Sequence, residues 1–145
     1  MTSRVELDIN APQPQAAQLF ADPRNNPRWM DDLERIEPIS GTLGEPGSIY
    51  KMVPKQGTLT FLATVVSRSL PTEVTLSLEN PRVSVGVRDT FLRLSDHKAR
   101  LISEEVFTFK GVFGKVTGLL AHRAIRNAHR RHMESFKRFV ESRAA

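Results

Sequence analysis

The C-terminal segment of this chain, residues 118–145, is the feature that most constrains its fold, because it has the pattern of one long amphipathic helix. At 100° per residue its apolar positions fall on one stripe, and most of its charged side chains fall on the opposite side. The stripe comprises Ala121, Ile125, Ala128, His132, Met133, Phe136, Phe139 and Val140. A helix with one apolar stripe must bury it, and the preceding segments have the pattern of β-strands. We therefore expect this helix to pack against a β-sheet.

The segments before the helix alternate apolar and polar residues, as half-buried strands do. The first of them spans residues 3–10, and turn residues separate six more, at 33–40, 48–54, 58–69, 73–80, 83–94 and 99–109. Two short helices are expected after the first strand, at 14–22 and 25–30. The chain is therefore expected to be α+β, with about seven antiparallel strands curved around the long helix. A sheet of this shape tends to enclose a cavity.

Length and composition limit the class of protein further. The chain has 145 residues, which fits a single domain spanning 1–145 with a core of its own. It has no cysteine, so disulfides, thiolate metal sites and cysteine nucleophiles are excluded. Its N-terminus lacks the apolar run of a signal peptide, and no stretch approaches the ~20 apolar residues of a membrane span. We expect a cytoplasmic protein that is a monomer or a homodimer.

The excess positive charge lies on the C-terminal segment. Residues 115–143 carry eight basic and two acidic side chains, a net charge of +6, whereas the rest of the chain carries −1. A basic face can attract nucleic acid or an anionic membrane. However, no aromatic residue interleaves with these arginines, as a platform for base stacking requires. We interpret the face as solvated and do not expect nucleic acid to be a partner.

Several local motifs accompany the order of elements. They are Ala11-Pro12 after the first strand, Asp22-Pro23 followed by Pro27-Arg28-Trp29, the turn at 44–50, and Phe107 and Phe109 before a glycine-broken loop. Together these features resemble the helix-grip fold of the START/Bet v 1-like (SRPBCC) superfamily, specifically its polyketide cyclase/dehydrase and lipid-transport branch, over essentially the whole chain. Members bind lipids, quinones, polyketides or hormones, or cyclise aromatic chains. The resemblance is therefore specific for the fold and leaves the activity open.

The resemblance implies a cavity between the inner face of the sheet and the long helix. The candidate ligand-binding residues are Trp29, Met30, Tyr50, Phe61, Val85, Val87 and Phe91, with Leu119 and Leu120 near the mouth. Leu119 and Leu120 lie toward the polar side of the helix. An exposed apolar pair at this position indicates a lid, a partner or a membrane contact.

Asp89 is an ionisable residue on an otherwise apolar face of its strand. If residues 96–97 form a two-residue hairpin turn, Asp89 lies opposite Glu104, and Arg88 lies opposite Glu105. The first pair would bring two carboxyl groups together, which raises one pKa and can supply an acid and a base. A register that differs by one residue would instead separate them. Asp89 and Glu104 are therefore catalytic candidates.

Three histidines, His122, His129 and His132, project within or beside the apolar stripe, and His122 is the best candidate for a polar anchor in the cavity. His129 and His132 are an i,i+3 pair, but no carboxylate lies at helical spacing on the same face. Zinc needs a third and usually a fourth ligand. The sequence also lacks a glycine-rich phosphate loop and a nucleophile elbow. We expect no metal and no cofactor.

Three functions follow as hypotheses. The first is the binding or transport of a hydrophobic small molecule, such as a lipid, a quinone or a polyketide-like ring system, in the cavity. The second is an aromatic polyketide cyclase or dehydratase that uses Asp89, Glu104 or His122. Cyclases of the family use an arginine inside the cavity, whereas Arg68 and Arg88 are expected to face outward, which favours binding. The third is an RNA- or ribosome-associated module that uses the basic helix.

Overall fold

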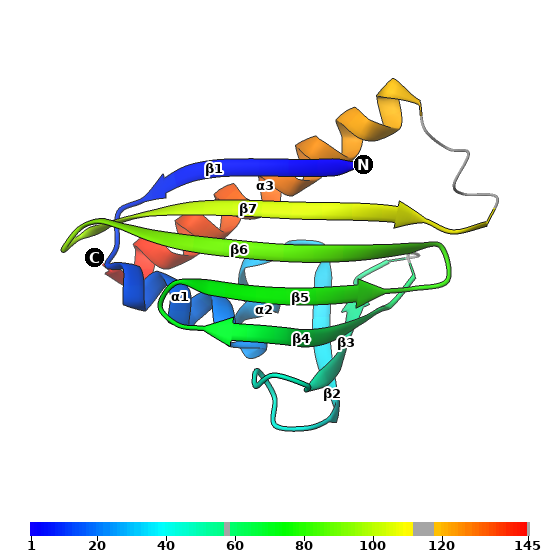
Figure 1. Cartoon of the computed structure of the whole chain (residues 1–145), viewed down its shortest axis with the longest axis horizontal. Helices are drawn as coiled ribbons and strands as arrows, with labels where there is room; N and C mark the ends of the chain where they lie inside the picture. The colour runs from blue at the N-terminus through cyan, green and yellow to red at the C-terminus, as the bar shows by residue number, and fades with distance from the viewer. Residues whose placement is uncertain (57–58, 112–117, 145) are drawn as a thin grey trace.

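The structure is a computed structural model that describes residues 1–56, 59–111 and 118–144 (Figure 1). Its main layer is a seven-stranded antiparallel sheet with the strand order β1-β7-β6-β5-β4-β3-β2. The strands are β1 (Thr2–Ile9), β2 (Leu33–Ser40), β3 (Ile49–Pro54), β4 (Phe61–Ser69), β5 (Glu73–Glu79), β6 (Val83–Ser95) and β7 (Lys98–Phe109). The helices are α1 (Gln13–Ala21), the 3-10 turn η1 (Pro23–Asn25), α2 (Asn26–Trp29) and α3 (Leu119–Ala144). The predicted α+β helix-grip architecture is confirmed.

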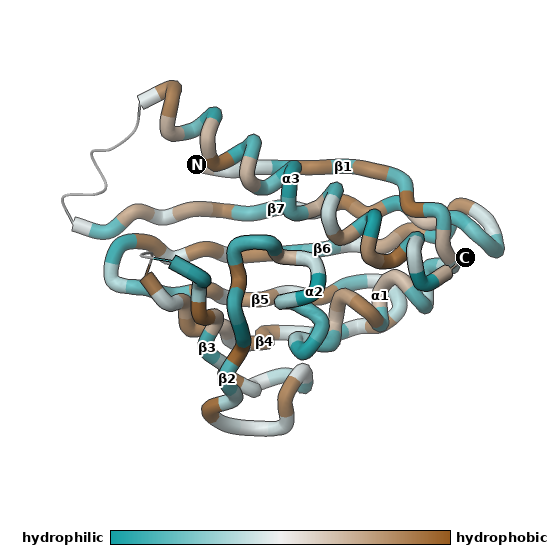
Figure 2. The backbone as a smooth tube through the Cα atoms, turned by 180° about the vertical axis from the view of Figure 1, so that it is seen from behind, coloured by the Kyte–Doolittle hydropathy of each residue, from teal (hydrophilic) through white to brown (hydrophobic). Residues whose placement is uncertain are grey.

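All three α-helices lie on one face of the sheet, and α3 runs along it against β1 (Figure 2). The buried residues of α3 are His129, Met133, Phe136 and Val140. Three of these belong to the predicted apolar stripe, and its other members are half-buried. The helix therefore buries its apolar side on the sheet, as the periodicity predicts.

An aromatic cluster fills the space between α3 and the sheet at the C-terminal end of the helix. Phe136 of α3 makes edge-to-face contacts with Phe20 of α1 and Trp29 of α2, with ring centroids 5.3 Å and 5.2 Å apart. Phe91 of β6 lies 6.3 Å from the Phe136 ring. Such pairs stabilise beyond the area that they bury. We call this region the packed end of the molecule.

The hairpin of β6 and β7 differs from its predicted register. Ser95 pairs with Lys98, as a two-residue turn requires, but Arg93 pairs with Ala99. A β-bulge between Arg93 and Ser95 takes up one extra residue on β6. Every pairing beyond the bulge is therefore shifted by one residue.

The shifted register changes the partners of the predicted catalytic pair. Asp89 lies opposite Ser103, and Arg88 lies opposite Glu104. The predicted pairing of Asp89 with Glu104 is wrong, as is that of Arg88 with Glu105. Since neighbouring residues of a strand point to opposite faces, Glu104 lies on the outer face of the sheet with Arg88. Arg88 makes its ion pair with Glu73 of β5, at 3.3 Å.

Candidate functional site

A cavity lies between the inner face of the sheet and the N-terminal half of α3, in two adjoining compartments. The inner compartment, of about 60 Å³, borders the packed end. The outer compartment has a volume of about 560 Å³ and is lined from α3 by Ile125, Ala128, His129 and His132. Small-molecule pockets in proteins typically measure about 300–1,000 Å³. The outer compartment is therefore large enough for an organic ligand.

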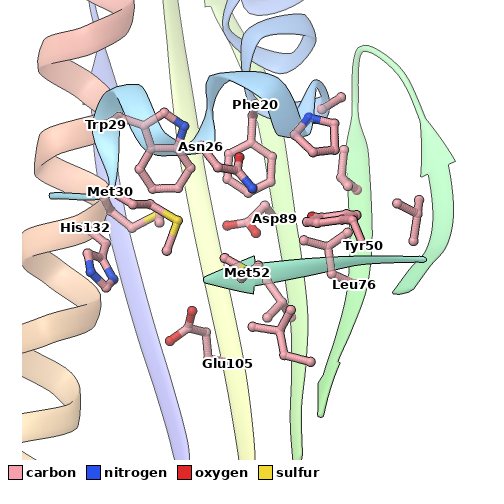
Figure 3. A pocket seen from close by; sticks show the side chains of 17 residues that line it. Phe20, Asn26, Trp29, Met30, Tyr50, Met52, Leu76, Asp89, Glu105 and His132 are labelled. Atoms are coloured by element: carbon pink, nitrogen blue, oxygen red, sulfur yellow. The ribbon is translucent and has the colours of Figure 1, made fainter. Parts of the chain in front are cut away.

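The two compartments meet at residues that line both of them. These are Met30, Met52, Leu78, Glu105 and His132. The walls of the inner compartment are mainly apolar, and no lysine or arginine contributes to them in the described part of the chain. Their polar side chains come from Asn26, Tyr50, Asp89, Glu105 and His132, and the indole ring of Trp29 is also part of the lining (Figure 3). The compartments thus combine apolar walls with a few convergent polar groups.

The structure divides the predicted ligand-binding residues into four groups. Trp29, Met30, Tyr50 and Val87 line the inner compartment, and Met30, Phe61 and Val85 line the outer one. Phe91 is fully buried in the aromatic cluster and lines neither compartment. Leu119 and Leu120 are 68% and 78% exposed at the start of α3, so the apolar pair lies on the surface as its position on the helix indicates. The role of all these residues in ligand binding stays a prediction.

Asp89 is the most unusual polar group in the cavity. Its side chain is fully buried, and neither carboxyl oxygen has a hydrogen-bonding partner among the described residues. Burial raises the pKa of Asp89 to about 8; Glu105 and Glu104 add to the rise, and the nearby Ser103 hydroxyl opposes it. That hydroxyl also lies 2.8 Å from His129 Nε2. At neutral pH Asp89 is therefore a neutral carboxylic acid.

Glu105 takes the place beside Asp89 that the sequence assigned to Glu104. Glu105 is on β7 and lies opposite Val87 of β6. It therefore shares the inner face of the sheet with Asp89 and is diagonal to it across the two strands. Diagonal neighbours in an antiparallel pair are roughly 7–8 Å apart. Burial raises the pKa of Glu105 to about 7. The cavity therefore holds two carboxyl groups with different proton affinities, and a one-residue bulge decided which glutamate became the second.

His129 connects helix α3 to strands β1 and β7 through two hydroxyl groups. Its Nδ1 lies 2.8 Å from the Ser3 hydroxyl of β1, and its Nε2 lies 2.8 Å from the Ser103 hydroxyl of β7. Burial lowers the pKa of His129 to about 4, and electrostatic interactions with His132 and Arg130 add to the effect. The ring is therefore a neutral imidazole, in which one nitrogen donates and the other accepts. Glu105 Oε1 lies 3.7 Å from Nδ1.

The structure places the three candidate histidines in different surroundings, and a role for His122 as a polar anchor stays a prediction. His122 is half-buried in the first turn of α3 and lines neither compartment, whereas His129 and His132 line the outer one. The sequence contained a signal for this arrangement, since Ser3 shares the inner parity of β1 with Val5, and Ser103 that of β7 with Leu101. A buried serine needs a hydrogen-bonding partner.

Two further polar groups face the inner compartment from the helical side and from β3. Tyr50 is almost fully buried, and burial raises its pKa to about 12, although a hydrogen bond with Asn26 opposes the rise. The Trp29 indole nitrogen is buried with no acceptor within the described ranges. Both groups are uncharged at neutral pH. The inner compartment therefore presents neutral polar groups, several of them hydrogen-bond donors.

The described residues contain no group of three or more histidine, aspartate or glutamate side chains arranged to hold a metal ion. Among the helices of the described ranges, none is long and apolar enough to cross a membrane. The arginines at 123, 126 and 130 on α3 are exposed.

Solved structures share this fold with little sequence identity. The aromatase/cyclase ZhuI from Streptomyces sp. R1128 superposes with a TM-score of 0.82 and 11% identity, covering 100% of this chain and 96% of that one. Ara h 8.0201 superposes with a TM-score of 0.74 and 16% identity, with 98% of both chains covered. A START superfamily protein from Mycobacterium smegmatis superposes with a TM-score of 0.75 and 14% identity, covering 99% of this chain and 96% of that one.

No protein-family model and no curated protein matches the sequence of this chain. The similarity to solved structures nevertheless covers the whole domain. The chain therefore has the Bet v 1/START-like (SRPBCC) fold, as its sequence motifs predict.

Proposed function

We propose that this protein binds a hydrophobic small molecule, with its apolar body in the outer compartment and a polar end in the inner one. The observation that carries the proposal is the cavity itself. It joins a volume of about 560 Å³ to a smaller chamber in which the buried polar atoms of Asp89 and Trp29 lack partners among the described residues. Buried polar groups normally have hydrogen-bonding partners, so a ligand is a fitting partner for both.

The apolar walls supply the driving force for binding. Transfer of apolar ligand surface out of water contributes about 25 cal/mol per Å². The polar groups add orientation, because a ligand that leaves them unsatisfied loses the hydrogen bonds that it made with water. Ara h 8.0201 and the START superfamily protein share the fold, and proteins of this fold bind hydrophobic ligands.

Nile red, an uncharged fluorescent dye, tests the proposal directly. Phe61 lines the outer compartment, whereas the adjacent Leu62 is an exposed residue of the same strand. We expect Phe61→Ala to weaken Nile red binding several-fold and Leu62→Ala to leave it unchanged. Native mass spectrometry of the purified protein should also reveal a co-purified small molecule. A wild-type protein that binds no Nile red and carries no such molecule would exclude this function.

An aromatic cyclase or dehydratase is the second candidate, and the pair formed by Asp89 and Glu105 supports it. The fold is shared with an aromatase/cyclase, and a cyclase must move protons on a folded chain. The test is turnover of a polyketide substrate, which Asp89→Asn should lose while Nile red binding persists. RNA binding by the exposed arginines of α3 stays a prediction that a salt titration would test.

A further inference from the structure

The inner compartment places two carboxyl groups on one wall, at different depths. Asp89 is fully buried and lines the inner compartment but not the outer one (Figure 3). Asp89 pairs with Ser103 of β7. Glu105 lies two residues further along β7, and it lines the place where the two compartments meet. A ligand that enters from the outer compartment therefore passes Glu105 before its end reaches Asp89.

The buried polar atoms without hydrogen-bonding partners indicate which chemical group of a ligand fits the inner compartment. Asp89 and the Trp29 indole nitrogen are buried, line the same compartment, and find no partner within the described residues. A protonated carboxyl group and an indole N–H are both hydrogen-bond donors. No cationic lysine or arginine from the described ranges lines the inner compartment. A neutral acceptor oxygen, such as a ketone carbonyl, therefore fits this site better than a carboxylate or a phosphate.

We propose that the cavity catalyses the enolisation of a bound ketone, with Asp89 as the acid at the carbonyl oxygen and Glu105 as the base at the adjacent carbon. The inference rests on the proposed ligand-binding function and adds a reaction to it. The ring system of the ketone lies in the outer compartment, its α-carbon lies beside Glu105, and its carbonyl points at Asp89.

Protons and electrons balance in this step. The Glu105 carboxylate takes a proton from the α-carbon, and the electron pair of that C–H bond forms the C=C bond of the enol. The π electrons of the carbonyl move to its oxygen, which takes the proton of Asp89. The reverse step returns a proton to carbon and restores both carboxyl groups. If Glu105 exchanges its proton with solvent before the reverse step, the α-carbon acquires a solvent hydrogen.

The electrostatics of the cavity support opposite protonation states for the two groups. Burial raises the pKa of both groups, to about 7 for Glu105 and about 8 for Asp89, and the charge of Glu105 adds to the rise at Asp89, so loss of one proton from the pair opposes loss of the second. The other titratable groups that face the pair are Tyr50 from β3 and His129 and His132 from α3. Asp32 and Arg82 line the outer compartment, and Glu104 lies on the outer face of the sheet. The state with one proton on the pair is therefore favoured near neutral pH.

Hydrogen–deuterium exchange on 1-tetralone, a bicyclic aromatic ketone, tests the reaction. The measurement is deuterium incorporation at the α-carbon in D₂O, followed by NMR. We expect wild-type protein to accelerate exchange over buffer, with a bell-shaped pH profile centred between 7 and 8. Glu105→Gln should lose about 100-fold of that rate, in line with the loss of a general base. Asp89→Asn should lose less, because an amide still donates, and should remove the fall in rate above pH 8.

Glu104→Gln is the matched control, since it changes the adjacent glutamate on the outer face, whose charge is the smallest contribution to the raised pKa of Asp89, and it should reduce the rate far less than Glu105→Gln does. Displacement of Nile red by 1-tetralone reports binding separately. Displacement without accelerated exchange would overturn the reaction and leave the proposed function standing. Nile red binding without displacement would overturn the ketone assignment.

Equal losses of rate in Glu104→Gln and Glu105→Gln would overturn the role of Glu105. Absence of Nile red binding would overturn the proposed function itself. If Glu105→Gln does not fold, the wild-type pH profile decides: a profile without the low-pH limb excludes a base of this kind.

Discussion

The two halves of α3 lie against different interiors. In its C-terminal half, Met133, Phe136 and Val140 are buried, and Phe136 is in ring contact with side chains from α1, α2 and β6. In its N-terminal half, Ile125 and Ala128 are only half-buried and line the outer compartment together with the buried His129. The same helix therefore completes a solid core at one end and forms a cavity wall at the other.

Strand β6 shows the same change along its inner face. Its inward residues run from Phe91 in the aromatic cluster, through Asp89 and Val87 in the inner compartment, to Val85 and Val83 in the outer one. What differs is the third layer. At the packed end, α1 and α2 insert Phe20 and Trp29 between helix and sheet. A cavity thus depends on the side chains that neighbouring elements supply, and the apolar pattern of one element does not reveal it.

Phe136→Ala should have the largest effect, because it removes the ring that joins the aromatic cluster. Fully buried Phe-to-Ala changes destabilise by about 3–5 kcal/mol. Urea denaturation would measure the loss in the free energy of unfolding. A loss below 1 kcal/mol would show that this end is not tightly packed.

Asp89→Asn, where the packed and hollow ends meet, should change the pH dependence of stability. Between the pKa of an unfolded aspartate, about 3.9, and the raised pKa of about 8 in the folded protein, the native state holds a proton that the unfolded state has released. Wild-type stability therefore falls as the pH rises through this window, by at most about 4 kcal/mol between pH 5 and pH 8 from this group.

The variant should lack this contribution to the fall. The measurement is the free energy of unfolding of both proteins at pH 5 and pH 8. The contribution of His129 is common to both proteins, whereas that of Glu105 includes its interaction with Asp89, so the difference between the two profiles reports Asp89 together with this interaction. Parallel pH profiles for wild type and variant would contradict the raised pKa of Asp89.

Ile125→Ala tests the hollow end of the same helix. Its side chain is half-buried at the outer compartment, so we expect a loss of only about 1 kcal/mol in stability, below the roughly 2–5 kcal/mol of fully buried Ile-to-Ala changes. Nile red affinity should fall several-fold. A stability loss as large as that of Phe136→Ala would remove the distinction between the two ends.

Leu120→Ser should have the smallest effect on stability, within about 0.5 kcal/mol, since the side chain is 78% exposed. Thermal unfolding would measure it. A larger loss would show that the exposed pair at the start of α3 packs against part of the protein in solution.

The sequence predicted the register-dependent part of the site poorly. The residues of the 83–94 and 99–109 strands were identified, but a two-residue turn at 96–97 implied Glu104 opposite Asp89. The bulge between Arg93 and Ser95 shifted that pairing and brought Glu105 to the cavity instead. Bulges arise from the local fit of two strands within a sheet, and no periodicity of a single strand signals them.

The sequence by itself determined the amphipathic helix, the order of strands along the chain and the fold, because periods of 3.6 and 2 are properties of neighbouring residues. It also singled out Asp89 as an ionisable group on an apolar face. Only the tertiary structure decided which glutamate lies beside it, that His129 rather than His122 is buried between two serines, and that Phe91 belongs to the packed end. These outcomes depend on contacts between elements that lie far apart in the chain, and such contacts form only when the sheet closes on the helix.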